Sequence, residues 1–335
     1  MDRLDQFDNI LIIKPGAIGD LLQLTPVLRA LKSRYPKACI SLLVGSPVTA
    51  ELFTYNTHVR ETIVFDKAGA HKSFRALLQL WRLLRGNKYD LIINFQRSNL
   101  KTWFLASAAF PCRVLVYHKA RTRTVHALVN YLETVAPLGI KATKMNLDLT
   151  LSARERVFAK EVIFSSGSAG TPLIALNPGA SHPVNRWATD RFAALSDMLT
   201  QKLAARVILI GGKEDIPLAE EIAAKTGSKP LNMAGKASLL QLGALLEQSD
   251  ILVSGDTGPM HIATAVGTRV VALFGAADPE RTGPVGSGHR IIQAADVPCI
   301  PCRSRTCNNK AYLECMEKIP VSLVFETIRD MLNKG

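Results

Sequence analysis

Residues 250–275 read DILVSGDTGPMHIATAVGTRVVALFG, and this stretch decides the fold. An apolar run at 251–253 leads into the glycine turn 255–258, then a helix opened by Pro259, then a β-rich run at 270–274. Proline at a first helical position loses no hydrogen bond, and Asp or Thr just before it can cap free amides. The stretch therefore predicts strand, turn, helix and strand, as in a parallel α/β sheet.

The same turn is a candidate phosphate site. A helix start presents unpaired N–H groups and the positive end of a dipole, which suits a phosphate. This helix begins beside Asp256, Thr257 and Gly258, and its first turn carries Met260 and His261. The alternative is an ordinary βαβ turn that binds nothing, because glycine turns are common in α/β folds.

The alternation of strand and helix patterns continues on both sides of residues 250–275. With 335 residues and 47% hydrophobic content, the chain is long enough for about two domains. We expect a first domain at 1–165, a flexible linker of small residues near 165–170 and a second domain at 171–320. The last periodic segment, 321–335, predicts a helix that packs back on the first domain.

The predicted class is α/β, with two doubly wound, Rossmann-like parallel sheets. Such sheets bind ligands beyond the carboxyl ends of their strands, so two domains facing across a cleft would place a site in that cleft. The other predicted strands are 9–14, 39–44, 61–65, 90–95, 113–117, 173–177 and 206–211. The predicted helices are 20–34, 72–85, 100–109, 190–202, 218–225 and 238–247.

Charge is distributed unevenly along the chain, whose net charge is +13. Residues 1–165 hold 24 basic and 12 acidic side chains, whereas residues 166–335 hold 17 and 16. This asymmetry favours two different ligands, one of them acidic or at a membrane surface; the alternative is a generally basic protein. Aromatic residues make up only 6% and do not interleave with the basic ones, so a nucleic-acid partner is not expected.

The sequence also bears on location. No apolar run approaches the roughly 20 residues that span a bilayer. The first nine residues are acidic rather than signal-like. We therefore expect a cytoplasmic protein.

The first glycine loop, KPGAIGD at 14–20, lies where the first strand passes into the first helix. It lacks both the three-glycine dinucleotide fingerprint and the Gly-Lys-Ser/Thr of a P-loop, so neither NAD binding nor ATP hydrolysis is supported. Asp20 is a candidate general base for an acceptor hydroxyl. The residues alone favour the alternative that Asp20 caps the helix.

Two loops of the second half carry further polar groups. In 177–187, small residues allow close backbone approach to a ligand, Ser181 offers a hydroxyl and Arg186 a charge for phosphate. In 211–215, the acidic residues Glu214 and Asp215 follow the predicted strand. An acid at this position can accept hydrogen bonds from the hydroxyls of a ribose, although it more commonly lies in solvent at the start of a helix.

Together these segments resemble the family 9 glycosyltransferases, the bacterial heptosyltransferases of lipopolysaccharide inner-core assembly. The similar segments are ILIIKPGAIGDLLQLTPVLRALK at 10–32, NPGASHPVNRWATDRFAAL at 177–195, SGDTGPMHIATAVGTRVVALFG at 254–275, and the cysteine-rich tail. The resemblance implies a GT-B fold, an ADP-heptose donor on the second domain and a lipid-linked acceptor, lipid A-Kdo or heptosylated core, on the first. It also implies inversion at the anomeric carbon.

The resemblance assigns site residues as well. It implies Asp20 as the base and places Asp256, Thr257 and Gly258, with His261 beside them, at the donor's diphosphate and sugar. From the loops themselves we add Lys14, Gly16 and Gly19 as predicted acceptor-binding residues. The further predicted donor-binding residues are Asn177, Gly179, Ser181, Arg186, Glu214, Asp215 and Met260. One position departs from the family, which commonly has Lys where this chain has Asn185. Either Arg186 or another cation substitutes, or the donor differs, or activity is reduced.

No cofactor is expected, and no metal is required, because fixed dipoles and cations can stabilise a leaving diphosphate. Four cysteines, Cys299, Cys302, Cys307 and Cys315, are close in sequence and offer a structural zinc site as a minor alternative. Their later spacing favours reduced thiols or a disulfide in a surface loop. Cys39 and Cys112 lie in strand patterns and are predicted to be small core residues.

The leading hypothesis is an inverting heptosyltransferase that contacts the anionic inner membrane peripherally. A sugar-nucleotide epimerase on the same two-domain plan is a second hypothesis, distinguished by turnover without an acceptor. A non-catalytic protein that binds nucleotide-sugar or glycolipid is the third, suggested by Asn185.

Overall fold

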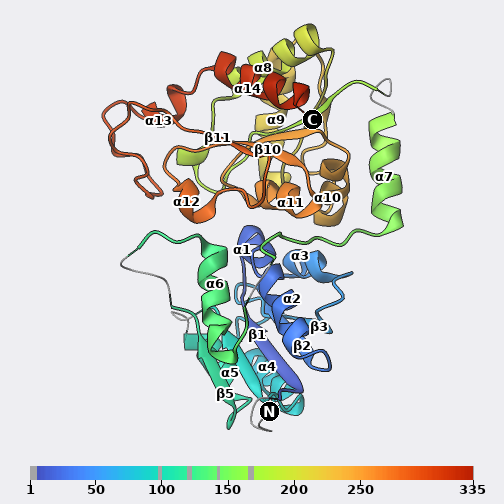
Figure 1. The fold of residues 1–335 in the computed structure, drawn as a ribbon, viewed down its shortest axis with the longest axis vertical. Coiled ribbons are helices and arrows are strands. Elements are labelled where there is room, and N and C mark those ends of the chain that lie inside the picture. Colours follow the sequence, from blue (N-terminus) through green and yellow to red (C-terminus); the bar gives the residue numbers. More distant parts are fainter. Residues whose placement is uncertain (1–5, 97–99, 119–122, 142–143, 165–169, 335) are drawn as a thin grey trace. The chain divides into compact units, whose positions relative to one another are not determined.

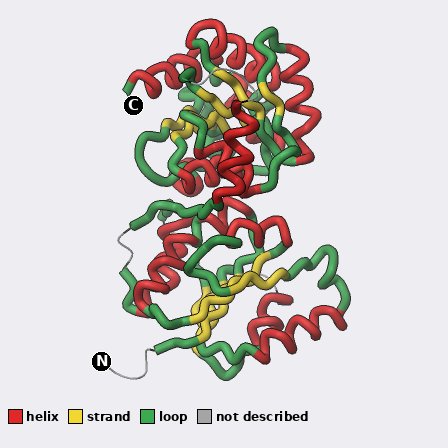
Figure 2. The backbone as a smooth tube through the Cα atoms, turned by 90° about the vertical axis from the view of Figure 1, so that its right-hand side faces the viewer, coloured by secondary structure: helices red, strands yellow, loops and turns green. Residues whose placement is uncertain are grey.

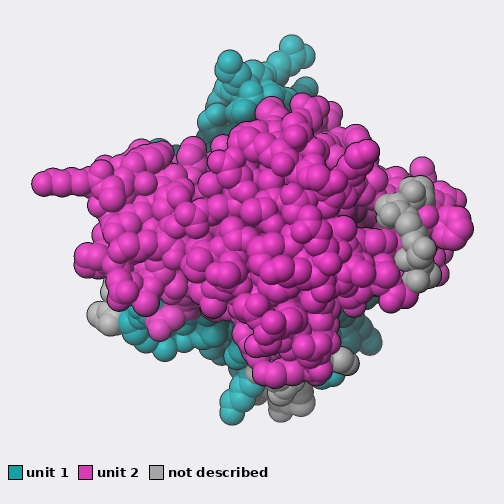
Figure 3. Space-filling view, turned by 90° about the horizontal axis from the view of Figure 1, so that it is seen from above, with its two compact units in different colours: residues 1–150 teal, residues 151–335 magenta. Residues whose placement is uncertain are grey.

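The computed structural model describes residues 6–96, 100–118, 123–141, 144–164 and 170–334. The chain forms two compact units, residues 1–150 and 151–335, coloured teal and magenta in Figure 3. The predicted linker at 165–170 lies outside the described residues except for Gly170. Among the described residues, no helix is long and apolar enough to cross a membrane.

The described part of unit 1 contains a parallel sheet in the order β3-β2-β1-β4-β5. Its strands are β1 Asn9–Ile13, β2 Cys39–Val44, β3 Glu61–Val64, β4 Leu91–Asn94 and β5 Arg113–Val116. The chain moves outward from β1 in one direction and then in the other, so the β1/β4 boundary is the topological switch point. Ile13 of β1 lies opposite Asn94 of β4 at this boundary.

Helices cover both faces of this sheet (Figures 1 and 2). They are α1 Ile18–Leu22, α2 Thr25–Arg34, α3 Pro47–Ala50, α4 Phe74–Gly86, α5 Leu100–Ser107 and α6 Ala127–Val135. Leu11 and Ile13 pack with buried side chains of α4 and α5 in one core. The alternate residues Ile10 and Ile12 point to the opposite face and are also fully buried. This two-sided burial explains why the strands read as apolar runs.

The described part of unit 2 has a parallel sheet in the order β11-β10-β9-β6-β7-β8. Its strands are β6 Leu173–Asn177, β7 Arg206–Leu209, β8 Leu231–Asn232, β9 Ile251–Gly255, β10 Arg269–Leu273 and β11 Arg290–Ile292. Counted from β6, this is the strand order of the Rossmann fold. Its switch point lies between β6 and β9, where Asn177 is opposite Ser254.

The helices of unit 2 are also arranged on both sides of the strands (Figure 2). They are α7 Ala153–Phe164, α8 Thr189–Leu203, α9 Ile216–Lys225, α10 Leu239–Glu247, α11 Gly258–Val266, α12 Pro279–Thr282, α13 Glu314–Glu317 and α14 Val321–Asn333. Residues of α8, α9 and α14 share one core with β6 and β9, and α10 packs against α7 and α11. The predicted α/β class with two doubly wound sheets is confirmed.

The end of the chain departs from the prediction. We expected the last helix to pack on the first domain, but α14 packs against α8 of unit 2. Its buried face, Val324, Phe325 and Ile328, completes the unit 2 core. The carbonyl of Ile319, just before this helix, accepts a hydrogen bond from the buried Trp187 Nε1 at 3.1 Å. The apolar stripe therefore has its partner within its own unit.

The unit boundary also lies earlier than the predicted linker. Residues 153–164, assigned to the first domain by the prediction, form α7, which packs against α10 of unit 2. Arg156 of α7 forms a bidentate ion pair with Glu247 of α10, with N···O distances of 2.8 and 2.9 Å. The contact-based boundary therefore falls between Thr150 and Leu151.

The single helix predicted at 20–34 is two helices. Helix α1 ends at Leu22 and α2 begins at Thr25, whose hydroxyl donates to the Leu22 carbonyl at 2.7 Å. Pro26 has no N–H to donate to a preceding turn, so it favours a new helix start here. The break makes α1 a short helix that begins within the first glycine loop.

Candidate functional site

Asp20 lies in the first turn of α1, beside the carboxyl end of β1. Its Oδ2 accepts from the Ala17 backbone N–H at 3.1 Å and lies 3.0 Å from Lys14 Nζ. Lys14 directly follows β1 and its side chain is buried, whereas the Asp20 side chain remains 39% exposed. Asp20 therefore contributes to helix capping and also presents a carboxylate to solvent.

Tyr131 of α6 holds the other oxygen of this carboxylate. Its hydroxyl donates to Asp20 Oδ1 at 2.9 Å, and Lys14 Nζ lies 5.3 Å from the centre of its ring. Burial, reinforced by the neighbouring Asp20 charge, raises the pKa of Tyr131 far above its usual range. The phenol therefore stays neutral and remains a hydrogen-bond donor. Three side chains from separate elements thus form one charged cluster.

The glycines of the first loop have different surroundings. Gly19 is buried within α1. At Gly16, no described atom lies within 4 Å of the position that a Cβ would occupy. The neighbouring Pro15 carbonyl lies so close to Gly45 that a Cβ there would collide with it. Of the two predicted acceptor-binding glycines, Gly16 and Gly19, Gly16 is therefore the one with open space beside it.

Asn94 ends β4, opposite the last residue of β1. It is fully buried, and its Oδ1 accepts from the Gln96 backbone N–H at 2.8 Å. Its Nδ2 has no hydrogen-bond partner among the described residues. A buried amide donor without a partner is uncommon, and this one lies at the switch point.

The switch point of unit 2 is built around Asn177 rather than around charges. The Asn177 Nδ2 contacts the Gly179 carbonyl at 3.3 Å, Ser254 Oγ at 2.9 Å and Thr257 Oγ1 at 3.0 Å. Asn177 is only 2% exposed. The network ties the loop after β6 to the turn after β9, and it places the predicted donor residues Asn177, Gly179 and Thr257 together.

Helix α11 begins at this network, with Thr257 as its N-cap residue. Within the described part of the unit, the Thr257 side chain makes no capping bond, because its hydroxyl contacts Asn177 and Ser254. The first-turn amides, beginning at Gly258, therefore keep their capacity to bind an anion.

The remaining residues of this turn have separate roles. Met260 is fully buried and is a core residue here. The buried His261 places Nε2 3.9 Å from Asp256 Oδ1, while Asp256 Oδ2 accepts from Thr282 Oγ1 at 2.9 Å. The structure therefore brings Asp256 and His261 together but directs Met260 into the core.

The loops after β6 and β7 meet at Asp215. This buried carboxylate accepts from the Gly212 backbone N–H at 2.9 Å and lies so close to Gly179 that a Cβ there would collide with it. Burial raises the pKa of Asp215, against the opposing effects of the Gly212 hydrogen bond and the Arg186 charge. Asp215 thus clamps two loops, whereas its predicted companion Glu214 is exposed.

The loop of residues 177–187, which follows β6, lies against the end of β9. The Asn185 backbone carbonyl is 2.8 Å from the position of a Cβ at Gly255. Arg186 is half-buried and donates to the Ala180 carbonyl at 3.1 Å, and Ser181 is exposed. Asn185, the position that departs from the family pattern, is therefore packed beside the turn that precedes α11.

A family model described as Glycosyltransferase family 9 (heptosyltransferase) matches residues 77–313, more than half of the chain. This chain belongs to glycosyltransferase family 9. The predicted assignment to the heptosyltransferases is therefore confirmed.

Individual relatives support this family assignment. The family 9 protein is 28% identical over 319 residues to lipopolysaccharide heptosyltransferase 3 of Escherichia coli K12, covering 88% of this chain and 90% of the relative. Its fold matches a family 9 glycosyltransferase from Veillonella parvula with a TM-score of 0.87 at 24% identity over 98% of both chains. It also matches the E. coli heptosyltransferase WaaC with ADP-2-deoxy-2-fluoro heptose, with a TM-score of 0.70 at 16% identity over 96% and 99% of the two chains. These matches confirm the predicted GT-B fold class.

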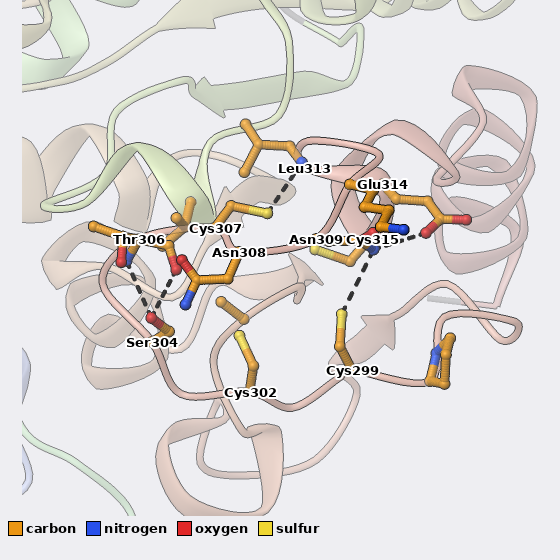
Figure 4. A pocket seen from close by; sticks show the side chains of 14 residues that line it. Cys299, Cys302, Ser304, Thr306, Cys307, Asn308, Asn309, Leu313, Glu314 and Cys315 are labelled. Atoms are coloured by element: carbon orange, nitrogen blue, oxygen red, sulfur yellow. Dashed lines mark hydrogen bonds between the residues drawn. The ribbon is translucent and has the colours of Figure 1, made fainter.

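The cysteine-rich tail of this family 9 protein lines a cavity of about 390 Å³ (Figure 4). Cys307 Sγ accepts from the Leu313 N–H at 3.3 Å, and Cys299 Sγ lies 3.8 Å from Asn309 Nδ2. All four tail cysteines are free thiols, so the disulfide alternative is not what the structure shows. Burial, followed by the neighbouring cysteines, raises the pKa of Cys315.

Among the described residues, no group of three or more His, Cys, Asp or Glu side chains is placed to hold a metal ion. The minor zinc alternative at Cys299, Cys302, Cys307 and Cys315 therefore has no geometric support. Cys39 and Cys112 are half-buried rather than core residues, because they lie at the beginning of β2 and just before β5.

The family motifs do not reveal two residues of the unit 1 site. Tyr131 is 111 positions from Asp20, and no glycine turn or charge pattern marks it. Asn94 is a polar residue that ends an otherwise apolar strand, and this signal was available in the sequence. Polar residues at strand ends are worth testing as site residues in parallel sheets.

Proposed function

We propose that this family 9 glycosyltransferase transfers a heptose from ADP-heptose to a lipid-linked inner-core lipopolysaccharide acceptor, with inversion. The observation that carries the proposal is the Asp20 carboxylate, oriented by Lys14 and Tyr131 yet still exposed. The names of its relatives and the ADP-sugar analogue bound to WaaC support the choice of sugar and donor.

In this proposal Asp20 is the general base. It accepts the proton of the acceptor hydroxyl while the hydroxyl oxygen forms a bond to the anomeric carbon. The Lys14 ion pair and the Tyr131 hydrogen bond hold the carboxylate in one orientation, which reduces the entropy lost on reaching the transition state. Gly16, with open space beside it, admits the acceptor.

Unit 2 then supplies the groups that stabilise the leaving ADP. As the anomeric carbon–oxygen bond breaks, negative charge develops on the diphosphate. The first-turn amides of α11 and the guanidinium of Arg186 are fixed donors suited to that charge. Arg186 replaces the cation that the family commonly has at Asn185, and no divalent metal is needed in this scheme.

The acceptor is membrane-bound in this proposal, so the enzyme works as a peripheral protein at an anionic cytoplasmic membrane surface. The excess of basic residues in positions 1–165 supports this location. Each Lys or Arg near such a surface contributes about 1 kcal/mol.

The proposal is tested by incubating the full chain with ADP-heptose and a heptose-free core lipid. Released ADP, the mass of the lipid and the anomeric configuration of the new linkage are measured. The proposal predicts one added heptose of inverted configuration per ADP released. It fails if neither ADP nor ADP-heptose raises the melting temperature of the protein.

Two outcomes of the same assay would favour the other functions. Conversion of the donor without any acceptor would indicate an epimerase. Donor binding without turnover across several acceptors would indicate a non-catalytic binding protein, for which Asn185 is the motivating residue.

A further inference from the structure

The outer surface of α4 and α5 in unit 1 carries exposed apolar side chains. Helix α4 buries Leu77, Leu80 and Leu84 in the core, yet exposes 71% of Phe74. Helix α5 likewise packs one face inward and exposes 86% of Leu100. Apolar side chains this exposed on neighbouring helices indicate a surface that is covered in the working protein.

Aromatic rings join the two helices into one surface. The ring centre of Phe104 in α5 lies 6.2 Å from Phe74 and 6.4 Å from Trp81, both in α4. Trp81 Nε1 also donates to Ser107 Oγ at 3.0 Å. Arg85 of α4 donates to the carbonyl of Phe110, a further half-exposed aromatic residue, at 2.6 Å. We call Phe74, Trp81, Leu100, Phe104 and Phe110 the α4–α5 face.

Basic residues outnumber acidic ones in the segment that contains the α4–α5 face. Residues 72–110 contain seven Lys and Arg and a single acidic residue, Asp90. The Asp90 carboxylate is occupied by the backbone N–H groups of Asp8 and Asn9, at 2.7 and 3.2 Å. Arg75 and Arg82 are exposed and lie two helical turns apart, on the same stripe of α4. The face therefore combines exposed apolar side chains with exposed arginines.

This combination matches the interface of an anionic bilayer. Aromatic rings with a polar edge concentrate at the headgroup level, and exposed Phe and Leu side chains gain free energy by entering the acyl boundary. Flanking Arg and Lys are attracted to anionic lipids. A second copy of the same face is a poorer partner, because its cations would meet like charges.

We propose that the α4–α5 face docks on an anionic phospholipid bilayer, with Phe74 and Leu100 inserted and the arginines at the headgroups. The inference rests on the proposed function only in assuming that the acceptor is lipid-linked. It goes further by naming the surface that brings unit 1 to the membrane.

The first experiment sediments the full chain with phosphatidylcholine vesicles, with or without phosphatidylglycerol. We expect binding to the anionic vesicles and an affinity at least about tenfold lower in the double variant F74S/L100S, because both side chains lose their insertion energy. The matched control is F164S, which removes an 85% exposed Phe from α7 of unit 2. F164S should bind like the wild type, and unchanged melting temperatures would show that all variants are folded.

A charge-reversal arm separates electrostatic attraction from insertion. We expect R75E/R82E to lose affinity for anionic vesicles and to show a weaker salt dependence, whereas K160E, at an exposed position of α7, should retain both. Binding of F74S/L100S at wild-type affinity would overturn the proposal, and so would equal losses in F164S. A fall in molecular mass on light scattering, specific to F74S/L100S, would instead identify the face as a contact between copies.

Transfer to a water-soluble, deacylated acceptor keeps this inference separate from the proposed function. We expect F74S/L100S to retain wild-type kcat/KM on that acceptor and to lose rate only on acceptor embedded in vesicles. If the wild type binds vesicles but transfers no sugar, the proposed function fails while the docking face stands. If F74S/L100S shows no loss of rate on embedded acceptor, the face does not serve catalysis at the membrane and the proposal is wrong.

Discussion

The two Rossmann-like units have the same strand order around their first strand, but their switch points carry different chemistry. In unit 1, the end of β1 leads to an ionic cluster of Lys14, Asp20 and Tyr131. In unit 2, the end of β6 is a network of neutral side chains, Asn177 with Ser254 and Thr257. The topology fixes where a site forms, and the side chains at the strand ends determine what it does.

The two switch points also differ in how exposed their side chains are. The Asp20 side chain is 39% exposed, whereas Asn177 is 2% exposed. Unit 1 therefore presents a solvent-accessible carboxylate, whereas the side chains at the unit 2 switch point are buried. If this comparison holds, substitutions in unit 1 should lower the rate of transfer, and substitutions in unit 2 should weaken donor binding.

The largest expected effect is that of D20N. The amide keeps the size of the carboxylate but cannot accept the acceptor proton, so kcat should fall by about 10²- to 10⁴-fold. The dissociation constant for ADP, measured by calorimetry, should be unchanged. D8N, which neutralises an exposed Asp of the same unit, should leave both quantities unchanged. Normal turnover by D20N would show that the Asp20 carboxylate of unit 1 does not determine the rate of transfer.

G255A should weaken donor binding by unit 2 rather than lower the rate of transfer. Its Cβ would lie 2.8 Å from the Asn185 carbonyl, so the loop of residues 177–187 must move away from the turn before α11. We expect weaker ADP binding and a loss of about 1–3 kcal/mol in the free energy of unfolding. G227A is the matched control, because no described atom lies within 4 Å of its new Cβ. Equal ADP affinity in both variants would contradict the assigned role of this loop.

Y131F tests whether Tyr131 orients Asp20, and its expected effect is smaller than that of D20N. The ring beside Lys14 remains, but the hydrogen bond to Asp20 Oδ1 is lost. A loss of about 1.4 kcal/mol in the transition state would lower kcat by roughly tenfold. Steady-state kinetics should show this fall at unchanged ADP affinity, and Y312F, on an exposed Tyr of unit 2, should show none. A change confined to stability would reduce Tyr131 to a packing residue.

The smallest expected effect concerns pH and Asp215. Burial raises the pKa of this carboxyl in the folded state above its usual 3.8, so the folded protein binds more protons than the unfolded chain just above that pH. Ionisation of Asp215 therefore removes stability as the pH rises from about 4 towards neutrality. D215N lacks this ionisation, so its free energy of unfolding should exceed that of the wild type towards neutral pH by a small amount.

Urea unfolding of both proteins at several pH values measures this difference. The gain of D215N should vanish below pH 3.8, where both states are protonated, and grow as the pH rises. A difference that does not vary with pH would show that the Asp215 charge is not what burial penalises.

The central strands were predictable from the sequence because they are buried on both faces, whereas the short strands β8 and β11 are mostly half-buried or exposed and were not predicted. The runs at 39–44 and 173–177 coincide with β2 and β6. Helices were less certain where the pattern was weak or interrupted. Helix α7 mixes charged and apolar residues without a clear helical stripe and was not predicted, and the break before α2 depends on one proline.

The candidate site was predictable only where glycine turns marked it. The loops at 14–20, 177–187 and 255–258 were recognised, and the structure places their residues at strand ends. An acid after β7 was expected to accept hydrogen bonds from a ribose or, more commonly, to begin a solvated helix; the Asp215 carboxylate is buried and packs against Gly179 and Gly211. Met260, predicted at the donor, is fully buried. The sequence did not indicate this burial, because burial depends on packing partners that a local pattern does not contain.

The sequence by itself determined the alternation of strands and helices, the turns between them and the family, because each depends on residues that are neighbours along the chain. Only the tertiary structure decided that Tyr131 holds Asp20, that α14 completes the core of unit 2 and that α4 and α5 present one face. These contacts join distant positions, and they form only after strand order and helix packing bring those positions together.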